Sequence, residues 1–179
     1  MKTNFLIKSV AVQILLLFAG VCGFAQDAPQ LTDPEIANVA VVANQIDIDY
    51  AKLAIDRSKN SEVKEFATTM IADHNAIIDQ AVALVTKLGV TPKDNPVSQS
   101  LLKQADKTTA MLKGKKGIAF DEAYINNEVA YHQAVIDAVK NMLIPQSQNA
   151  ELKALLKTAL PILETHLGHA KMAQSKILK

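Results

Sequence analysis

The sequence predicts an all-α protein, a single four-helix bundle with a long crossover between its second and third helices. Three observations predict this fold. Ala, Leu, Ile, Val and Lys dominate the 179 residues, with only six Gly and six Pro, a composition that favours helices. Apolar residues recur every three to four positions in four long segments. No segment shows the alternation of period two that half-buried strands require.

The first 25 residues predict a cleaved signal peptide. Lys2 and Lys8 give this segment a positive start, and an apolar run over residues 10–21 follows. Small side chains then precede a cleavage site between Ala25 and Gln26. The run is shorter than the roughly 20 residues that a transmembrane helix needs. An uncleaved N-terminal anchor is the alternative interpretation.

Cleavage at this site defines a four-helix bundle domain of residues 26–179. It removes two of the 19 basic residues and none of the 18 acidic ones, together with Cys22, the one cysteine. A domain without thiols has no disulfide, thiolate metal site or cysteine nucleophile. No block of Lys and Arg indicates a nucleic-acid partner. We therefore expect an exported protein, periplasmic or associated with the cell envelope, with no transmembrane segment in its mature chain.

The first helix begins at a group of start residues. Thr32 and Glu35 form a capping box, and Pro34 suits the first helical turn. We expect the helix to end near Ser58. Its apolar stripe is Ile36, Val39, Ala43, Ile46, Tyr50 and Leu53.

The second helix begins after a cap at Asn60 or Ser61 and stops at Gly89, a residue type that favours helix C-termini. The short connection from the first helix makes the two antiparallel neighbours. Its apolar stripe is Val63, Ala67, Met70, His74, Ile77, Ala81, Leu84 and Leu88.

Residues 90–117 interrupt the helical pattern. Pro92 and Pro96 open this connection, and Gly114 and Gly117 close it. A structureless connection of this length is unusual in a compact domain, so we expect a crossover that runs the length of the bundle. Such a crossover makes the second and third helices parallel. A short helix within it is predicted by Leu101, Leu102, Ala105 and Leu112.

The third helix is predicted over roughly Ile118–Leu143, with a break at Pro145, and the fourth over about Asn149–Leu178. Pro161 lies inside the fourth helix and is expected to kink it, because its ring removes a backbone hydrogen bond. The third helix carries Ile125, Val129, His132, Ile136, Val139 and Leu143 on one stripe. The fourth carries Leu152, Leu156, Ala159, Leu163, His166, Ala170, Ala173 and Ile177.

Three histidines occupy apolar stripe positions, each on a different helix. His74, His132 and His166 lie at similar distances from the ends of their helices, so we expect them at one depth near mid-height. Asp47 reaches the same level on the first helix. Glu128 lies one turn before His132 on the same face. The spacing predicts a cluster of three histidines and one or two carboxylates in the bundle core.

This cluster has two interpretations. Neutral imidazoles and carboxylates suit one ion of Zn, Fe, Cu or Mn, and bundle cores hold such ions, so His74, His132, His166, Asp47 and Glu128 are the candidate ligands. Alternatively, the histidines are buried polar residues that order the core through bonds to Asp47, Glu128, Tyr124, Tyr131 or Asn127. Two nearby residues are expected to lie elsewhere: Asp73 on another, surface side of its helix, and His169 as a solvated residue at the edge of the stripe.

A dinuclear iron centre of the ferroxidase type is not expected. Such centres take a Glu-x-x-His pair from each of two helices. The positions three residues before the four histidines hold Ile71, Val129, Leu163 and His166, none of which is a carboxylate.

Three motifs carry a resemblance to a known family. They are Phe66-Ala67-x-x-Met70-Ile71-x-Asp73-His74, Phe120-Asp121-x-x-Tyr124 followed by His132, and Leu160-Pro161-x-Leu163-x-x-His166-Leu167. Over roughly residues 31–177 the chain resembles the DUF4142 family of exported bacterial proteins, often labelled outer membrane proteins. The resemblance implies a ferritin-like fold and export, places the three histidines at the family's histidine positions, and implies no activity. The family often has Glu where this chain has the shorter Asp47.

Three functions are compatible with these observations. The first is an exported bundle without catalysis that holds a transition metal or acts in stress response. The second is a metal-dependent redox enzyme. The third is a structural or partner-binding periplasmic module whose histidines order the core. No nucleophile–base pair or phosphate loop is present, which favours a protein that is not an enzyme. The sequence does not specify a protein partner or an oligomeric state.

Overall fold

The computed structural model describes residues 29–177, so the predicted signal peptide and Leu178 lie outside the described part. All elements of residues 29–177 are helices. They are α1 (Asp33–Arg57), α2 (Ser61–Leu88), α3 (Pro96–Lys113), α4 (Ile118–Ala138), the π-helical turn η1 (Val139–Leu143), α5 (Ile144–Gln146) and α6 (Ala150–Ile177). The predicted all-α class is confirmed.

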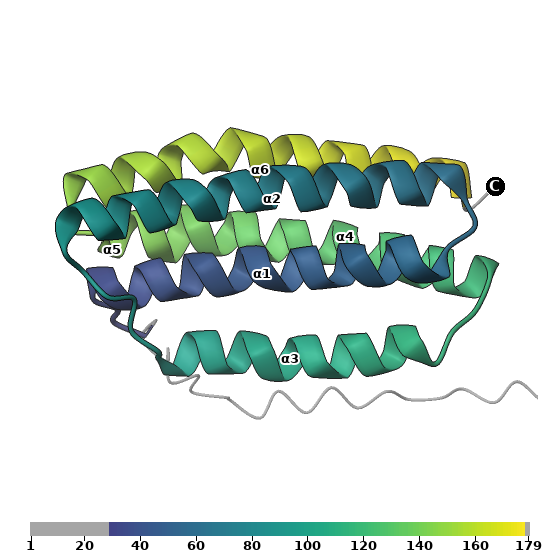
Figure 1. The fold of residues 1–179 in the computed structure, drawn as a ribbon, viewed down its shortest axis with the longest axis horizontal. Helices are drawn as coiled ribbons and strands as arrows, with labels where there is room; N and C mark the ends of the chain where they lie inside the picture. Colours follow the sequence, from purple (N-terminus) through teal and green to yellow (C-terminus); the bar gives the residue numbers. More distant parts are fainter. Residues whose placement is uncertain (1–28, 178–179) are drawn as a thin grey trace, which may run out of the picture.

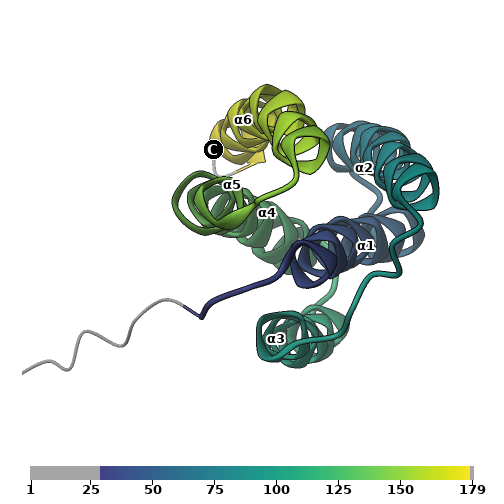
Figure 2. The same cartoon turned by 90° about the vertical axis from the view of Figure 1, so that its left-hand side faces the viewer.

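Four of these helices form the bundle. Around its axis α1 packs on α2, α2 on α6, α6 on α4, and α4 on α1, as the end-on view of Figure 2 shows. The fifth long helix, α3, lies outside this ring along α1 and is shorter than the helices of the bundle (Figure 1). Because α3 carries the chain back to the far end, α2 and α4 point in the same direction, as the crossover predicts.

Most of the predicted helix ends within residues 29–177 are observed. The Glu35 carboxylate accepts hydrogen bonds from the backbone N–H and hydroxyl of Thr32 at the start of α1. The side chain of Asn60 caps α2, and Gly89 ends it with φ of 64°, a left-handed conformation that glycine adopts without strain. Asn149 caps α6 through its side-chain oxygen. These local signals fix where each helix begins and ends.

The crossover holds a longer helix than the sequence indicated. Helix α3 spans 18 residues and is capped by Asn95. Near its C-terminus the fully buried Leu112 enters the core, and Arg57 of α1 donates hydrogen bonds to the carbonyls of Lys113 and Lys115. These contacts hold the C-terminal end of the crossover against the bundle.

The break predicted at Pro145 occurs slightly later, at residues 147–149. The chain stays helical to Gln146 because α4 widens into the π-turn η1, where the N–H of Ile144 bonds the carbonyl of Val139 five residues earlier. A wider turn relieves the clash that a proline ring makes with the fourth preceding carbonyl of an α-helix. Helix α6 also continues through Pro161, which is exposed. The kink at that residue stays a prediction.

The buried side chains form two apolar clusters with a polar layer between them. One cluster centres on Tyr50, Met70 and Tyr124, and the other on Ile36 and Leu156. The buried polar layer between them consists of Asp47, His74, Glu128, His132 and His166. Polar groups therefore occupy the middle of an otherwise apolar core.

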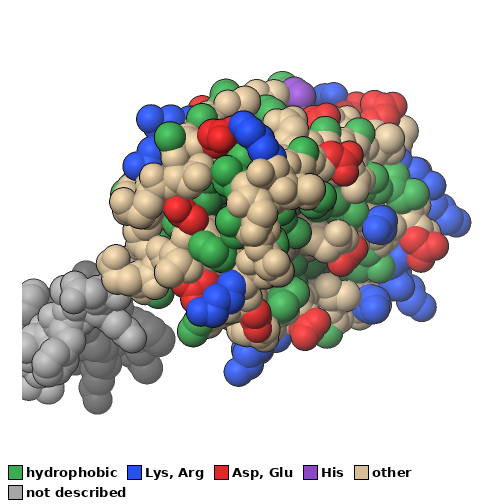
Figure 3. Space-filling model, turned by 60° about the vertical axis from the view of Figure 1, so that its left-hand side comes forward, with side chains coloured by type: hydrophobic (Ala, Val, Ile, Leu, Met, Phe, Trp, Pro, Cys, Tyr) green, Lys and Arg blue, Asp and Glu red, His purple; other side chains and the backbone are tan. Residues whose placement is uncertain are grey.

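The surface carries mixed charge. On the face shown in Figure 3, acidic and basic side chains are interspersed and hydrophobic atoms are visible between them. Nothing on this surface indicates a nucleic-acid partner. None of the helices in residues 29–177 combines the length and apolarity that a membrane span requires.

Candidate metal centre

The structure brings all five candidate ligands together at mid-height. Asp47 comes from α1, His74 from α2, Glu128 and His132 from α4, and His166 from α6. Glu128 and His132 lie four residues apart and so share one face of α4. All five side chains belong to residues that are no more than 2% exposed. The cluster is therefore sealed from bulk solvent.

The distances within the cluster are short. Asp47 Oδ1 lies 3.6 Å from His74 Nε2, and Asp47 Oδ2 lies 3.5 Å from His132 Nε2. One ring nitrogen from each of the three histidines lies within 4.8 Å of the others, and the same limit holds for ligand atoms of Asp47, Glu128 and His132. Four ligands around one ion with bonds of about 2.1 Å are about 3.4 Å apart. The Asp47–imidazole distances already match that geometry.

Each imidazole is oriented by a hydrogen bond from one of its nitrogens. His74 Nδ1 donates to Asn44 Oδ1 at 2.6 Å, and the Asn44 amide in turn donates to the Ala40 carbonyl. His132 Nδ1 donates to the Glu128 carbonyl at 3.0 Å. His166 Nε2 donates to Asp73 Oδ2 at 2.9 Å. All three partners only accept hydrogen bonds in this arrangement, so they fix the tautomer of each ring.

The other nitrogen of each ring has no hydrogen-bond partner. His74 Nε2, His132 Nε2 and His166 Nδ1 are buried and unpaired, as are both oxygens of Asp47 and Oε2 of Glu128. With the tautomers fixed as above, the three nitrogens carry lone pairs. Buried polar atoms without partners are uncommon, because each forfeits its hydration. Here six such atoms, all of them potential metal ligands, belong to one cluster.

Burial shifts the titration of these groups toward their neutral forms. It raises the pKa of Asp47 to about 7 and, together with the nearby Asp47 charge, raises the pKa of Glu128 well above its usual range. Burial and the neighbouring rings lower the pKa of His74 to about 3, and burial lowers the pKa of His132 to about 4. Burial also lowers the pKa of His166. The imidazoles are therefore neutral at pH 7, as metal ligands must be.

A small cavity adjoins the cluster. Its volume is about 10 Å³, and Asp47, His74, His132, Asn44 and Tyr131 are among the residues that line it. This space is close to the minimum that holds a single water molecule. It accommodates one ion or one water and excludes an organic substrate.

The sequence profile of the family described as "Domain of unknown function (DUF4142)" matches residues 23–173. The chain belongs to the DUF4142 family. No curated protein matches the sequence of this DUF4142 protein. Among solved structures it is similar in fold to one described as "CopM in the Cu(II)-bound form". The two chains are 18% identical, with a TM-score of 0.61, over 82% of this chain and 98% of CopM.

Two residues that orient histidines in this DUF4142 protein were missed from sequence. Asp73 is half exposed, as expected for a surface residue, yet its carboxylate also reaches across to His166 on α6. Asn44 contacts His74 from α1. The spacing of Asn44, three residues before Asp47 on one helix face, is the signal that could have identified it. His169 is exposed, as predicted.

Three of the five partners considered for a purely structural cluster, Tyr124, Tyr131 and Asn127, do not bond the histidines in the described part of the chain. Carboxylate oxygens of the other two, Asp47 and Glu128, lie 3.5 to 3.6 Å from imidazole nitrogens. Tyr131 donates to the carbonyl of Ala43, and Asn127 donates to Glu128. The hydroxyl of Tyr124 is buried without a partner. Within the described residues, the histidine bonds go instead to Asn44, the Glu128 carbonyl and Asp73.

Proposed function

We propose that this protein is an exported helical bundle that holds one divalent transition-metal ion in its core. The ligands are His74 Nε2, His132 Nε2, His166 Nδ1 and the Asp47 carboxylate. Glu128 lies beside them as a second carboxylate that binds the ion or balances its charge.

One observation carries this proposal. The buried atoms of the cluster that have no hydrogen-bond partner are all potential metal ligands, and the other nitrogen of each imidazole ring already donates a hydrogen bond. Metal-binding histidines generally donate their second N–H to a carboxylate, a carbonyl or an amide oxygen, which orients the ring. Asp73, the Glu128 carbonyl and Asn44 supply one of each. In a cluster that served only to order the core, we would expect these buried nitrogen and oxygen atoms to have hydrogen-bond partners as well.

Charge balance favours a divalent cation. Asp47 and Glu128 are two adjacent carboxyl groups in a sealed interior, and without a cation both cannot ionise at neutral pH. A divalent ion neutralises both charges, and neutral imidazoles add no further charge. The ion would release the protons that the metal-free carboxyl groups hold.

The donor set favours Cu(II) or Zn(II). Three imidazoles and a carboxylate suit both ions, and affinity for such a site generally rises from Mn(II) to Cu(II) before falling at Zn(II). The similar fold of CopM, described with Cu(II) bound, adds independent support for copper. We therefore propose Cu(II) as the ion that binds most tightly.

Holding the ion is better supported than catalysis at it. Catalytic metal sites keep an open coordination position for water or substrate. Here the ligands are no more than 2% exposed, and the adjoining space is about 10 Å³. Export follows from the predicted signal peptide, and it places the protein in the periplasm or cell envelope.

The direct test is a titration of protein purified without a histidine tag. We expect calorimetry to give one Cu(II) per chain, weaker binding of Zn(II), and a higher Tm in the presence of either ion, because an ion that binds only the folded state stabilises it. Metal analysis after dialysis checks the stoichiometry. Absence of stoichiometric metal, with an unchanged Tm, would leave the structural interpretation of the cluster in its place.

The orienting role of Asp73 gives a separate prediction. Asp73→Ala removes the acceptor that holds His166, so we expect Cu(II) affinity to fall by about 10- to 100-fold with the stoichiometry unchanged. Asp79→Ala, at an exposed position on the same helix, is the matched control and should bind like the wild type. Competition titration with a copper chelator measures both. Equal affinity of the two variants would remove Asp73 from the site.

A further inference from the structure

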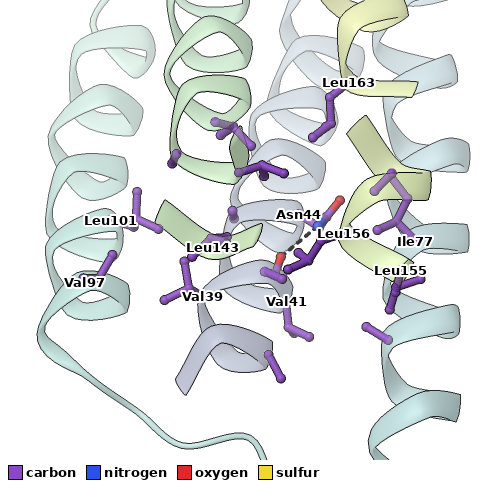
Figure 4. Close-up of a pocket in the computed structure, with 18 of the residues that line it drawn as sticks. Val39, Val41, Asn44, Ile77, Val97, Leu101, Leu143, Leu155, Leu156 and Leu163 are labelled. Atoms are coloured by element: carbon purple, nitrogen blue, oxygen red, sulfur yellow. Dashed lines mark hydrogen bonds between the residues drawn. The ribbon is translucent and has the colours of Figure 1, made fainter. Parts of the chain in front are cut away.

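A second cavity lies beside the metal centre, in the half of the bundle that contains η1. Its volume is about 150 Å³. Helices α1, α2, α3, α4 and α6 all contribute to its wall, and Figure 4 shows side chains from these helices facing a common space. It is some fifteen times larger than the space at the histidines.

The wall of this cavity is almost entirely apolar. Of the 25 residues that line it, 22 are Ala, Val, Leu, Ile or Met, and the exceptions are Asn44, Gln104 and Tyr131. The Asn44 amide already bonds Ala40 and His74, and the Tyr131 hydroxyl already bonds Ala43. Gln104 is exposed. The wall therefore offers little hydrogen bonding to an occupant, which favours an uncharged apolar molecule.

The π-turn contributes to this cavity. Val139, Met142 and Leu143 of η1 all line it. Single π-turns inside α-helices are rare and often occur at functional sites. The π-turn that carries the chain past Pro145 therefore also shapes the wall of this cavity.

The cavity adjoins the metal centre. Five residues line both this cavity and the small space at the histidines: Ala43, Asn44, Tyr131, Val135 and Leu163. Figure 4 shows Asn44 among the lining side chains, with Leu163 above it. Because Asn44 also accepts the hydrogen bond of His74 Nδ1, one side chain both lines the cavity and orients an imidazole of the centre.

We infer that this cavity binds a small, uncharged apolar molecule, about the size of benzene, next to the metal centre. An apolar cavity of about 150 Å³ in another protein stays dry and binds benzene or xenon, which sets the size of the occupant. The position of the occupant beside an ion rests on the proposed function. Binding to the cavity itself does not, because none of the proposed metal ligands is among its lining residues.

Benzene and xenon are the probes for the test, with metal-free protein first. We expect saturable binding of one benzene per chain by calorimetry and a shifted ¹²⁹Xe resonance. Ala81→Leu, which places a larger side chain into the cavity from α2, should lower benzene affinity at least tenfold and raise Tm by a few degrees. If Ala81→Leu does not fold, Ala159→Leu is used in its place, because it fills the cavity from α6.

The matched control is Ala83→Leu, an equal substitution at an exposed position of α2, which should bind benzene like the wild type. Absence of saturable benzene binding by the wild type, or an equal loss in Ala83→Leu, would overturn the inference.

For the position beside the ion, benzene should change the EPR spectrum of the Cu(II)-loaded wild type and leave that of Ala81→Leu unchanged. An unchanged wild-type spectrum at saturating benzene would refute that position. Benzene binding by a protein that takes up no Cu(II) would refute only the proposed function.

Discussion

Replacing His132 with alanine is expected to abolish stoichiometric Cu(II) binding under conditions that saturate the wild type. His132 belongs to both groups of candidate ligands, the three histidines and the set with Asp47 and Glu128. Loss of an orienting partner of a ligand already lowers metal affinity by about 10- to 100-fold, so loss of a ligand at the centre of the cluster should exceed a hundredfold. Calorimetry and metal analysis of dialysed protein measure the effect.

His169 provides the matched control for this experiment. It lies on α6 less than one turn from His166 but is exposed, so His169→Ala should keep full stoichiometry and affinity. Circular dichroism verifies that His132→Ala remains helical, and His132→Gln replaces it if the smaller side chain disrupts the core. Equal copper binding by the wild type and both His132 variants would contradict the proposed ligand set.

Asp47→Asn is expected to raise the stability of the metal-free protein at pH 7.5 while removing most of the stabilisation by Cu(II). The Asp47 carboxyl is fully buried, neither of its oxygens has a hydrogen-bond partner, and burial raises its pKa from 3.8 to about 7. Ionisation of such a group favours the unfolded chain. The amide never ionises, so we expect a gain of about 1–4 kcal/mol in the free energy of unfolding.

The size of this effect depends on pH. A carboxyl group whose pKa is raised on folding favours the folded state while it is protonated. This contribution to the free energy of unfolding is complete below the unfolded pKa of 3.8 and is lost as the pH rises to the folded pKa of about 7. The difference between Asp47→Asn and the wild type should therefore be small near pH 4, grow up to about pH 7, and then level off. Urea denaturation of metal-free protein across this range measures it.

Asp49→Asn is the control for the Asp47 substitution, because Asp49 lies on the same helix and is largely exposed. Surface substitutions of this kind usually change stability by no more than about 0.5 kcal/mol. A clear loss of metal-free stability in Asp47→Asn at pH 7.5 would indicate that the carboxylate orders the core, and it would count against a metal-binding role.

Much of the architecture follows from local sequence features. The Thr32–Glu35 capping box, the Asn60 cap and Gly89 mark helix ends, and the structure places the ends there. Caps and apolar periodicity depend on residues within one or two turns, so they can be identified without knowledge of the fold. The shared depth of the three histidines also followed from counting residues along straight helices, which rise by a constant amount per residue.

Features that depend on neighbouring helices were not predicted. The chain passes Pro145 by widening into η1, a choice between a break and a π-turn that the surrounding packing decides. Asp73 bonds His166 and Asn44 bonds His74 because α6 and α1 lie next to α2. The spacing of Asn44 places it on the same helix face as Asp47, but spacing alone does not show which side chain of the next helix it contacts. The extent of α3 and the cavity beside the cluster likewise result from how five helices pack.

The sequence by itself determined the helical class, most of the helix ends, the family and which five polar residues share one level of the bundle. Only the tertiary structure decided that their rings and carboxyl groups meet. It also decided that one nitrogen of each imidazole is hydrogen-bonded, whereas the other nitrogen and both oxygens of Asp47 have no partner. The physical reason is that helix periodicity is a local property, whereas the pairing of a buried polar atom depends on side chains from other helices that only folding brings within hydrogen-bond distance.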